Sequence, residues 1–120
     1  MSQHAVIWLD HHQARIHEFD AAKASLQKVR EHVHATGQHH AATRSQHEFY
    51  AEVCDALQAS AEVLVTGAHM AQADFRHYVE KHRPALVPRI VGWQTMDHPS
   101  DGELLASARK YFDRRTRLGM

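Results

Sequence analysis

The chain has 120 residues, of which 43% are hydrophobic and 23% charged, and its 14 basic and 14 acidic residues cancel. This length suits one domain over residues 1–120 and is too short for two well-filled cores. The composition excludes wholesale disorder, and the zero net charge excludes a protein held on nucleic acid by its overall charge.

Two residue types add to this picture. Cys54 is the only cysteine, which excludes an internal disulfide and a multi-thiolate zinc site. Histidine is abundant, with 13 residues, and because imidazoles titrate near about pH 6.5, mild acidification makes the chain cationic. The N-terminal segment lacks a basic region followed by an apolar one, and no apolar stretch approaches membrane-spanning length. We therefore expect a cytoplasmic protein without membrane contact.

The first part of the chain predicts strands. Residues 4–9 form an apolar, β-rich run typical of a buried strand. A polar turn over 10–13 separates this run from a second one over 14–19, so the two form a predicted β-hairpin. Residues 25–34 alternate loosely in hydrophobicity and predict a third strand.

The next segment contains no apolar residue larger than alanine from Ala35 to Ser45, so residues 35–44 are expected to form an exposed loop. Ser45 is a candidate N-cap, with Glu48 three residues later to complete a capping box. The helix that follows carries an apolar stripe at helical spacing: Phe49, Val53, Ala56 and Leu57.

The second half of the chain alternates strands and helices. Residues 62–67 form an apolar run closed by glycine, typical of a central parallel strand. A helix over 70–82 ends before Pro84, a strand covers 89–93, and a last helix covers 100–115 with Ser100 and Glu103 as its capping box. The order βββαβαβα predicts an α/β protein with a mixed five-stranded sheet and helices on its faces.

Four pieces of the sequence occur in the order and spacing of one known domain. They are Thr36-Gly37-Gln38-His39-His40-Ala41-Ala42-Thr43-Arg44, Leu64-Val65-Thr66-Gly67, Gln72-Ala73-Asp74-Phe75, and the strand within 84–93. Together, over Ala5 to Phe112, they resemble the middle domain of archaeal and eukaryotic peptide-chain release factors and of Pelota, a ribosome-rescue factor. The resemblance implies a three-layer α/β/α, ribonuclease-H-like fold in a stand-alone, bacterial-type protein.

The resemblance also implies a catalytic loop. Release factors carry Gly-Gly-Gln there, and the glutamine main-chain N–H faces the ester that is hydrolysed in peptidyl-tRNA. Gly37 and Gln38 match the second glycine and the glutamine, whereas Thr36 replaces the first glycine. A β-branched residue is disfavoured at positive φ, so this departure counts against ester hydrolysis. A plain turn before a helix is the alternative for the same residues.

Two clusters of cations and imidazoles are candidates for RNA contact. The loop supplies His39, His40 and Arg44, and the last helix supplies Arg109, Lys110, Arg114 and Arg115. Other interpretations stay open. The loop histidines suit a solvated loop or, with His32 and His34 on one face of a strand, a metal site. A helix C-terminus favours cations in any protein.

Carboxylates near strand ends raise a nuclease alternative, because such groups can gather magnesium ions. The candidates are Asp10, Glu18, Asp74 and Asp97. A hairpin needs a polar turn residue at Asp10 in any case, and Asp74 has a non-catalytic counterpart in the release-factor pattern. Residues 97–103 contain Asp, His and Ser but fit a turn and helix N-cap better than a catalytic triad. We expect neither a metal nor another cofactor.

Three functions remain. The leading hypothesis is a translation-associated protein that binds the ribosome or tRNA through the 35–44 loop and the basic C-terminal helix. Codon recognition is not expected, because 120 residues cannot hold the separate decoding domain of a release factor. The alternatives are a peptidyl-tRNA ester hydrolase that uses Gln38, and a homo-oligomeric interaction module that has the fold without the activity.

Overall fold

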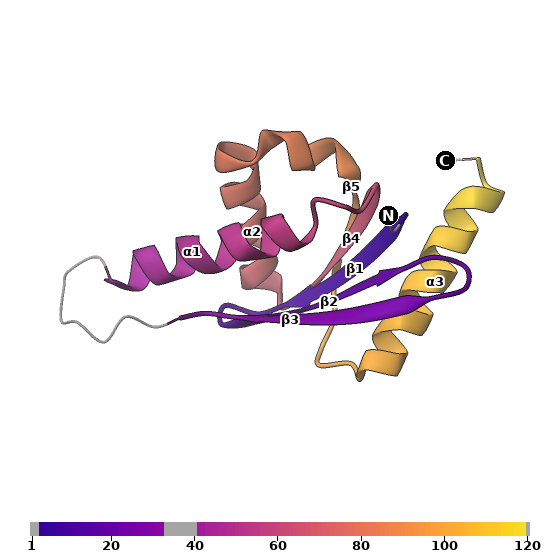
Figure 1. Cartoon of the computed structure of the whole chain (residues 1–120), viewed down its shortest axis with the longest axis horizontal. Helices are drawn as coiled ribbons and strands as arrows, with labels where there is room; N and C mark the ends of the chain where they lie inside the picture. Colours follow the sequence, from indigo (N-terminus) through magenta and orange to yellow (C-terminus); the bar gives the residue numbers. More distant parts are fainter. Residues whose placement is uncertain (1–2, 33–40, 120) are drawn as a thin grey trace.

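The computed structural model of the chain describes residues 3–32 and 41–119 (Figure 1). Its elements follow in the order β1 (His4–Leu9), β2 (Gln13–Phe19), β3 (Ala24–Arg30), α1 (Ala41–Ala56), β4 (Glu62–Gly67), α2 (His69–His82), the 3₁₀ helix η1 (Pro84–Arg89), β5 (Ile90–Thr95) and α3 (Asp101–Arg117). This is the predicted βββαβαβα order, with one additional 3₁₀ turn.

The strands form one five-stranded sheet in the order β3-β2-β1-β4-β5. β2 runs antiparallel to both β1 and β3, while β4 runs parallel to both β1 and β5. The antiparallel half comes from the hairpins at the start of the chain, and the parallel half from the alternation of helices and strands that follows. The predicted mixed sheet is therefore confirmed.

Helices cover the sheet on both sides (Figure 1). Successive side chains of a strand point to opposite faces, and β1 supplies both cores. Its Ile7 and Leu9 pack in the core under α1 and α2, and its Trp8 packs in the core under α3. A continuous apolar run is what a central strand needs when both of its faces are buried. The fold is thus three layers, α/β/α.

Gly67 ends β4 in a conformation that other residues rarely adopt. Its φ is 141°, and a Cβ at this position would collide with the carbonyl oxygen of Leu9. Beyond it, the side-chain amide of Gln72 donates to the carbonyl oxygens of Gly67 and Gln94, both at 2.9 Å. These bonds fix the start of α2 against the ends of β4 and β5. At its other end α2 stops at His82, two residues before Pro84.

The start of α3 is held by polar contacts. Ser100 Oγ accepts from the Glu103 N–H at 3.2 Å, and Glu103 Oε1 accepts from the Ser100 N–H at 2.9 Å, so the predicted capping box is present. Arg15 donates to Asp101 Oδ1 and to the carbonyl oxygen of Pro99, both at 2.7 Å. Residues 97–103 are therefore a turn and a helix start, as expected.

Two predicted boundaries are wrong. α1 begins at Ala41, and Ser45 lies inside the helix with 2% of its surface exposed, so it is not the N-cap. Alanine is the strongest helix former, and neither glycine nor proline separates Ala41 from Ser45. β3 ends at Arg30, whereas the predicted strand extended to residue 34. His32 therefore lies beyond the strand and cannot share a strand face with His34, as the metal-site alternative required. Residues 41–44 of the predicted loop belong to α1, and residues 35–40 lie outside the described residues.

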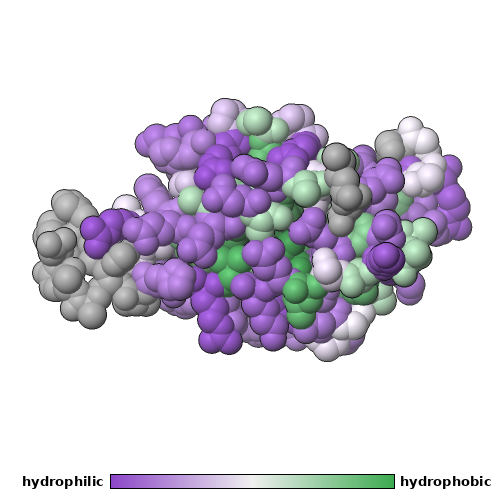
Figure 2. Space-filling model, viewed as in Figure 1, coloured by the Kyte–Doolittle hydropathy of each residue, from purple (hydrophilic) through white to green (hydrophobic). Residues whose placement is uncertain are grey.

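The surface is hydrophilic over most of the face seen in Figure 2, with small hydrophobic areas between the hydrophilic residues. Among the described residues, no helix combines the length and the apolar character that a membrane crossing requires. Cys54 is buried, as predicted for a core position, and burial raises the pKa of its thiol to about 11.

Candidate functional site

Some of the cations predicted on α3 are used to hold the helix on the sheet. The Arg109 guanidinium donates to the carbonyl oxygen of Asp20 at 2.9 Å and lies 5.1 Å from the centre of the Phe19 ring. Arg115 Nη2 lies 3.4 Å from Glu62 Oε2. These two arginines bridge α3 to the neighbouring strands, which gives them a structural task.

The other predicted α3 cations are exposed. Lys110 and Arg114 are four residues apart, so they lie on the same side of the helix. Neither forms an ion pair within the described part of the chain. Arg117, in contrast, pairs with Asp113 at 3.2 Å. Lys110 and Arg114 are therefore the charges that α3 offers to a phosphate.

A cavity of about 430 Å³ lies beside these cations, between α3 and the turn that joins β2 to β3. Lys110 and Arg109 contribute to its rim, and the ring of His4 stacks on Phe112 at 4.1 Å in its wall. The aromatic residues Phe19 and Phe112 are almost fully buried. The cavity thus presents cations and polar groups to solvent, while its rings serve the core.

The predicted loop residues Gly37, Gln38, His39 and His40 lie outside the described residues. Their catalytic and RNA-binding roles stay predictions. Arg44, predicted with them, lies in α1 with half of its side chain exposed, 3.9 Å from Glu48 in an i,i+4 pair. Such a pair holds its arginine weakly, so the guanidinium of Arg44 remains available to other anions.

Arg44 and the α3 cations do not form one surface. α1 packs on the face of the sheet that carries the larger core, and α3 packs on the opposite face. In Figure 1 the N-terminal end of α1 lies at the far left and α3 at the right. The sequence pattern gave no information on this separation, because it depends on which face each helix covers.

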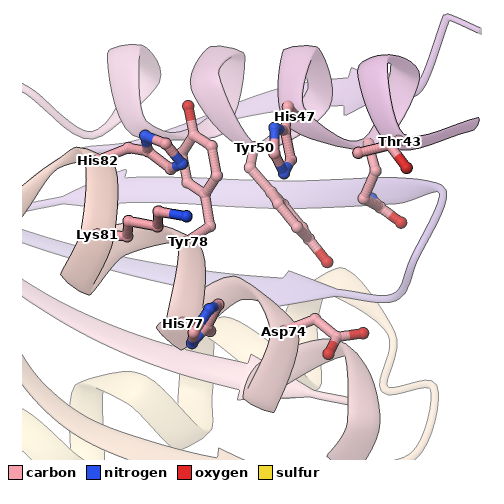
Figure 3. A pocket seen from close by; sticks show the side chains of 9 residues that line it. Thr43, His47, Tyr50, Asp74, His77, Tyr78, Lys81 and His82 are labelled. Carbon is pink, nitrogen blue, oxygen red and sulfur yellow. The ribbon is translucent and has the colours of Figure 1, made fainter. Parts of the chain in front are cut away.

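A second cavity of about 430 Å³ lies between α1 and α2, and the sequence pattern did not predict it. We call it the α1–α2 groove. Its lining consists of polar and aromatic side chains: Thr43, Gln46, His47, Tyr50, Asp74, His77, Tyr78, Lys81 and His82. Figure 3 shows that those from α1 face those from α2 across the opening.

Tyr50 forms part of the wall of this groove. It is 2% exposed, and its hydroxyl oxygen has no hydrogen-bond partner among the described residues. Burial, followed by the nearby carboxylates of Asp74 and Glu31, raises the pKa of this phenol well above its ordinary value, so it stays protonated. A buried hydroxyl without a partner costs about 1–3 kcal/mol. It is therefore a hydrogen-bonding group that the fold itself does not use.

Asp74 stands at the end of the groove where the β1–β2 turn approaches. Nε2 of His11, in that turn, lies 2.8 Å from Asp74 Oδ2. The Gln46 side chain donates to the carbonyl oxygen of His11 at 3.0 Å. α1 and α2 are thus both tied to this turn at the Asp74 end of the groove.

The carboxylates considered for a nuclease site are not gathered. Asp10 accepts hydrogen bonds from the main-chain N–H groups of His12 and Gln13, at 2.7 and 2.8 Å, and so shapes the hairpin turn. Glu18 accepts from the Ser60 hydroxyl at 3.2 Å. Within residues 3–32 and 41–119, no group of three or more His, Cys, Asp and Glu side chains is arranged to hold a metal ion.

The sequence contains the helical spacing of the groove residues, but not the packing that brings the two helices together. Tyr78, Lys81 and His82 share one side of a helix at spacings of three and four, as do His47 and Tyr50 on α1. Each set is typical of the polar margin of an amphipathic helix. Only the packing of α1 beside α2 brings the two margins together.

No protein-family model matches the chain, and no curated protein matches it. Solved structures do. Pelota from Archaeoglobus fulgidus is similar with a TM-score of 0.60 and 14% sequence identity, over 94% of this chain and 31% of that one. The archaeal translation termination factor aRF1 is similar with a TM-score of 0.61 and 14% identity, over 97% of this chain and 41% of that one.

The chain therefore spans less than half the length of these two proteins. At this identity the likeness concerns the fold, and at that level it confirms the resemblance to the release factors and Pelota. The mixed five-stranded sheet with three helices matches the fold of the release-factor middle domain.

Proposed function

We propose that this chain is a translation-associated protein that binds ribosomal RNA or tRNA through the exposed cations of α3. Lys110 and Arg114 carry the proposal, because they are neighbouring positive charges without an ion-pair partner among the described residues. The fold supports it, since proteins named as a translation termination factor and as Pelota contain a domain of the same architecture.

The binding is expected to be weak and sensitive to salt. The chain has no net charge, so its affinity for RNA depends on a few local contacts. Each phosphate contact releases counterions, and two such contacts give a slope of about −1.4 to −1.8 in a plot of log affinity against log salt. Arg44, on the helix that covers the opposite face of the sheet, would add a second contact.

Ester hydrolysis is not part of this proposal. Gln38 would have to supply it, and Thr36 stands where the release-factor loop has its first glycine. The proposal concerns this domain alone, and codon recognition is not part of it.

The test is co-sedimentation with purified ribosomes at low and at raised salt. The double variant Lys110→Ala/Arg114→Ala removes two charges from α3, and Lys28→Ala/Arg76→Ala removes two exposed charges from β3 and α2 as a matched control. We expect the native chain and the control to pellet with ribosomes at low salt, and the α3 variant to lose most of its bound fraction. Equal losses in both variants would mean that α3 has no special role.

A further inference from the structure

The α1–α2 groove lies on the face of the sheet opposite to Lys110 and Arg114. A ligand bound in the groove would therefore not contact these two cations. We propose that the groove binds a nucleotide, with the base against the rings of Tyr78, His47 and His82 and the phosphate at Lys81. The proposal goes beyond ribosome binding and does not depend on it.

Aromatic side chains supply the place for the base. The ring centres of Tyr78 and His82 are 4.8 Å apart, and that of His47 lies 5.4 Å from Tyr78 and 5.6 Å from His82. Their planes are inclined to one another by 38° to 57°. The three rings therefore form a curved wall, and Figure 3 shows them bordering the opening. Every base has a flat π-face that can stack on such a wall.

The charges of the groove fit a ligand with one anionic end. Lys81 is exposed and forms no ion pair among the described residues, and His82 lies next to it in the chain. Asp74 lies at the other end (Figure 3), where its carboxylate can accept from a sugar hydroxyl or a base amino group. A phosphate would meet repulsion at Asp74 and attraction at Lys81, which fixes the direction of the ligand.

The length of the groove agrees with one nucleotide. Asp74 and Lys81 are seven residues apart on α2, which is two helical turns or roughly 10 Å along the axis. A nucleoside monophosphate is comparable in length. Inorganic phosphate would leave the aromatic wall unused, and a neutral aromatic molecule would leave Lys81 unused, so neither occupies the whole groove.

Tyr50 provides a second, independent indication of a ligand. Its hydroxyl is buried at the wall of the groove and has no partner among the described residues. In Figure 3 its ring runs from α1 toward the Asp74 end, where the sugar or base edge would lie. A ligand oxygen or nitrogen that reaches this hydroxyl gives it the hydrogen bond that the fold does not.

The nucleotide can be free or part of an unpaired RNA strand, since both carry the same base, sugar and phosphate. Isothermal titration of the full chain with AMP, with a single-stranded RNA of four adenosines, and with inorganic phosphate separates these sources. Tyr78→Leu removes the central ring, Lys81→Ala removes the cation, and Tyr50→Phe removes only the hydroxyl. Lys28→Ala removes an exposed cation from β3 as a matched control, and circular dichroism with thermal unfolding checks the fold of each variant.

We expect AMP or the RNA to bind, with affinity at least tenfold weaker in Tyr78→Leu and in Lys81→Ala, several-fold weaker in Tyr50→Phe, and unchanged in Lys28→Ala. Binding of both ligands identifies a nucleotide site, and binding of the RNA alone assigns it to a strand. No binding of either at millimolar concentration would overturn the proposal. It would also be overturned if phosphate bound as tightly as AMP, or if Lys28→Ala weakened the binding as much as Lys81→Ala.

Discussion

The two faces of the sheet use their polar side chains differently. On the α3 face, Arg15 bonds Asp101 and Pro99, and the Tyr111 hydroxyl donates to the carbonyl oxygen of Val91 at 3.0 Å. Arg115 pairs with Glu62 through Nη2, while its Nε is buried without a partner among the described residues. On the α1–α2 face, the Tyr50 hydroxyl has no partner among the described residues. Partnered groups of this kind contribute to folding, whereas an unpartnered one costs stability. Tyr50 differs from Arg115 in that it lines the α1–α2 groove.

The largest expected effect concerns the core that holds α3. Phe112 is 3% exposed and packs against Phe19, with ring centres 5.9 Å apart. Phe112→Ala should lower the free energy of unfolding by about 3–5 kcal/mol, because it removes buried contacts and leaves a cavity. Urea unfolding followed by circular dichroism measures this. The exposed control Lys110→Ala should change it by less than about 0.5 kcal/mol.

The next effect concerns the polar contacts at the start of α3. Arg15→Ala removes the two 2.7 Å hydrogen bonds to Asp101 and Pro99. We expect a loss of about 1.5–2 kcal/mol in unfolding free energy, the lower part of the range for bonds to charged groups, because Asp101 is partly exposed. Arg44→Ala breaks only an exposed i,i+4 pair and should cost about 0.5 kcal/mol or less. Equal losses of unfolding free energy in Arg15→Ala and Arg44→Ala would contradict this difference between the α3 face and the α1–α2 face.

The pH dependence of the same contact gives a smaller effect. Burial tends to raise the pKa of Asp101, but hydrogen bonds from Arg15 and His17 outweigh it and lower the pKa below its usual value. A carboxylate with a lowered pKa stabilises the fold above its unfolded pKa of about 4, and this contribution is lost as pH falls through the folded value. Asp101→Asn should therefore melt below the native chain at pH 7.

At a pH below the folded pKa of Asp101 the two melting temperatures should converge. Asp113→Asn, which removes an exposed carboxylate from the same helix, serves as the control and should melt close to the native chain at pH 7. A gap between Asp101→Asn and the native chain that stayed constant from pH 7 to pH 3 would show that the charge of Asp101 does not contribute.

The smallest effect compares two tyrosines across the sheet. Tyr111→Phe removes a hydroxyl bonded to Val91 and should cost about 1 kcal/mol. Tyr50→Phe removes a buried hydroxyl without a partner among the described residues, so stability should stay the same or rise by up to about 1 kcal/mol. Thermal unfolding of the two variants measures these two changes in stability. A larger loss in Tyr50→Phe than in Tyr111→Phe would reverse the comparison.

Much of the fold could be predicted from local patterns. The apolar runs of β1 and β4 indicate central strands because both of their faces are buried, and Ser100 with Glu103 marks the start of α3 because a capping box acts locally. The start of α1 was misplaced because Ser45 looks like an N-cap, although the alanines before it favour helix.

Little of the candidate site could be predicted in this way. The sequence identified the cations of α3, but whether each one binds a carboxylate or faces solvent depends on its neighbours in space, as the difference between Arg115 and Arg114 shows. The α1–α2 groove is made by two helices whose polar margins meet only after packing. A pattern along one helix cannot reveal that contact.

The most direct test of RNA binding through α3 is ribosome co-sedimentation at low salt of three proteins: the native chain, Lys110→Ala/Arg114→Ala and the control Lys28→Ala/Arg76→Ala. The native chain and the control should pellet with ribosomes, because both keep the α3 cations, and the α3 double variant should remain in the supernatant. A native chain that stays in the supernatant at low salt, or an α3 double variant that pellets as fully as the native chain, would contradict the proposed function.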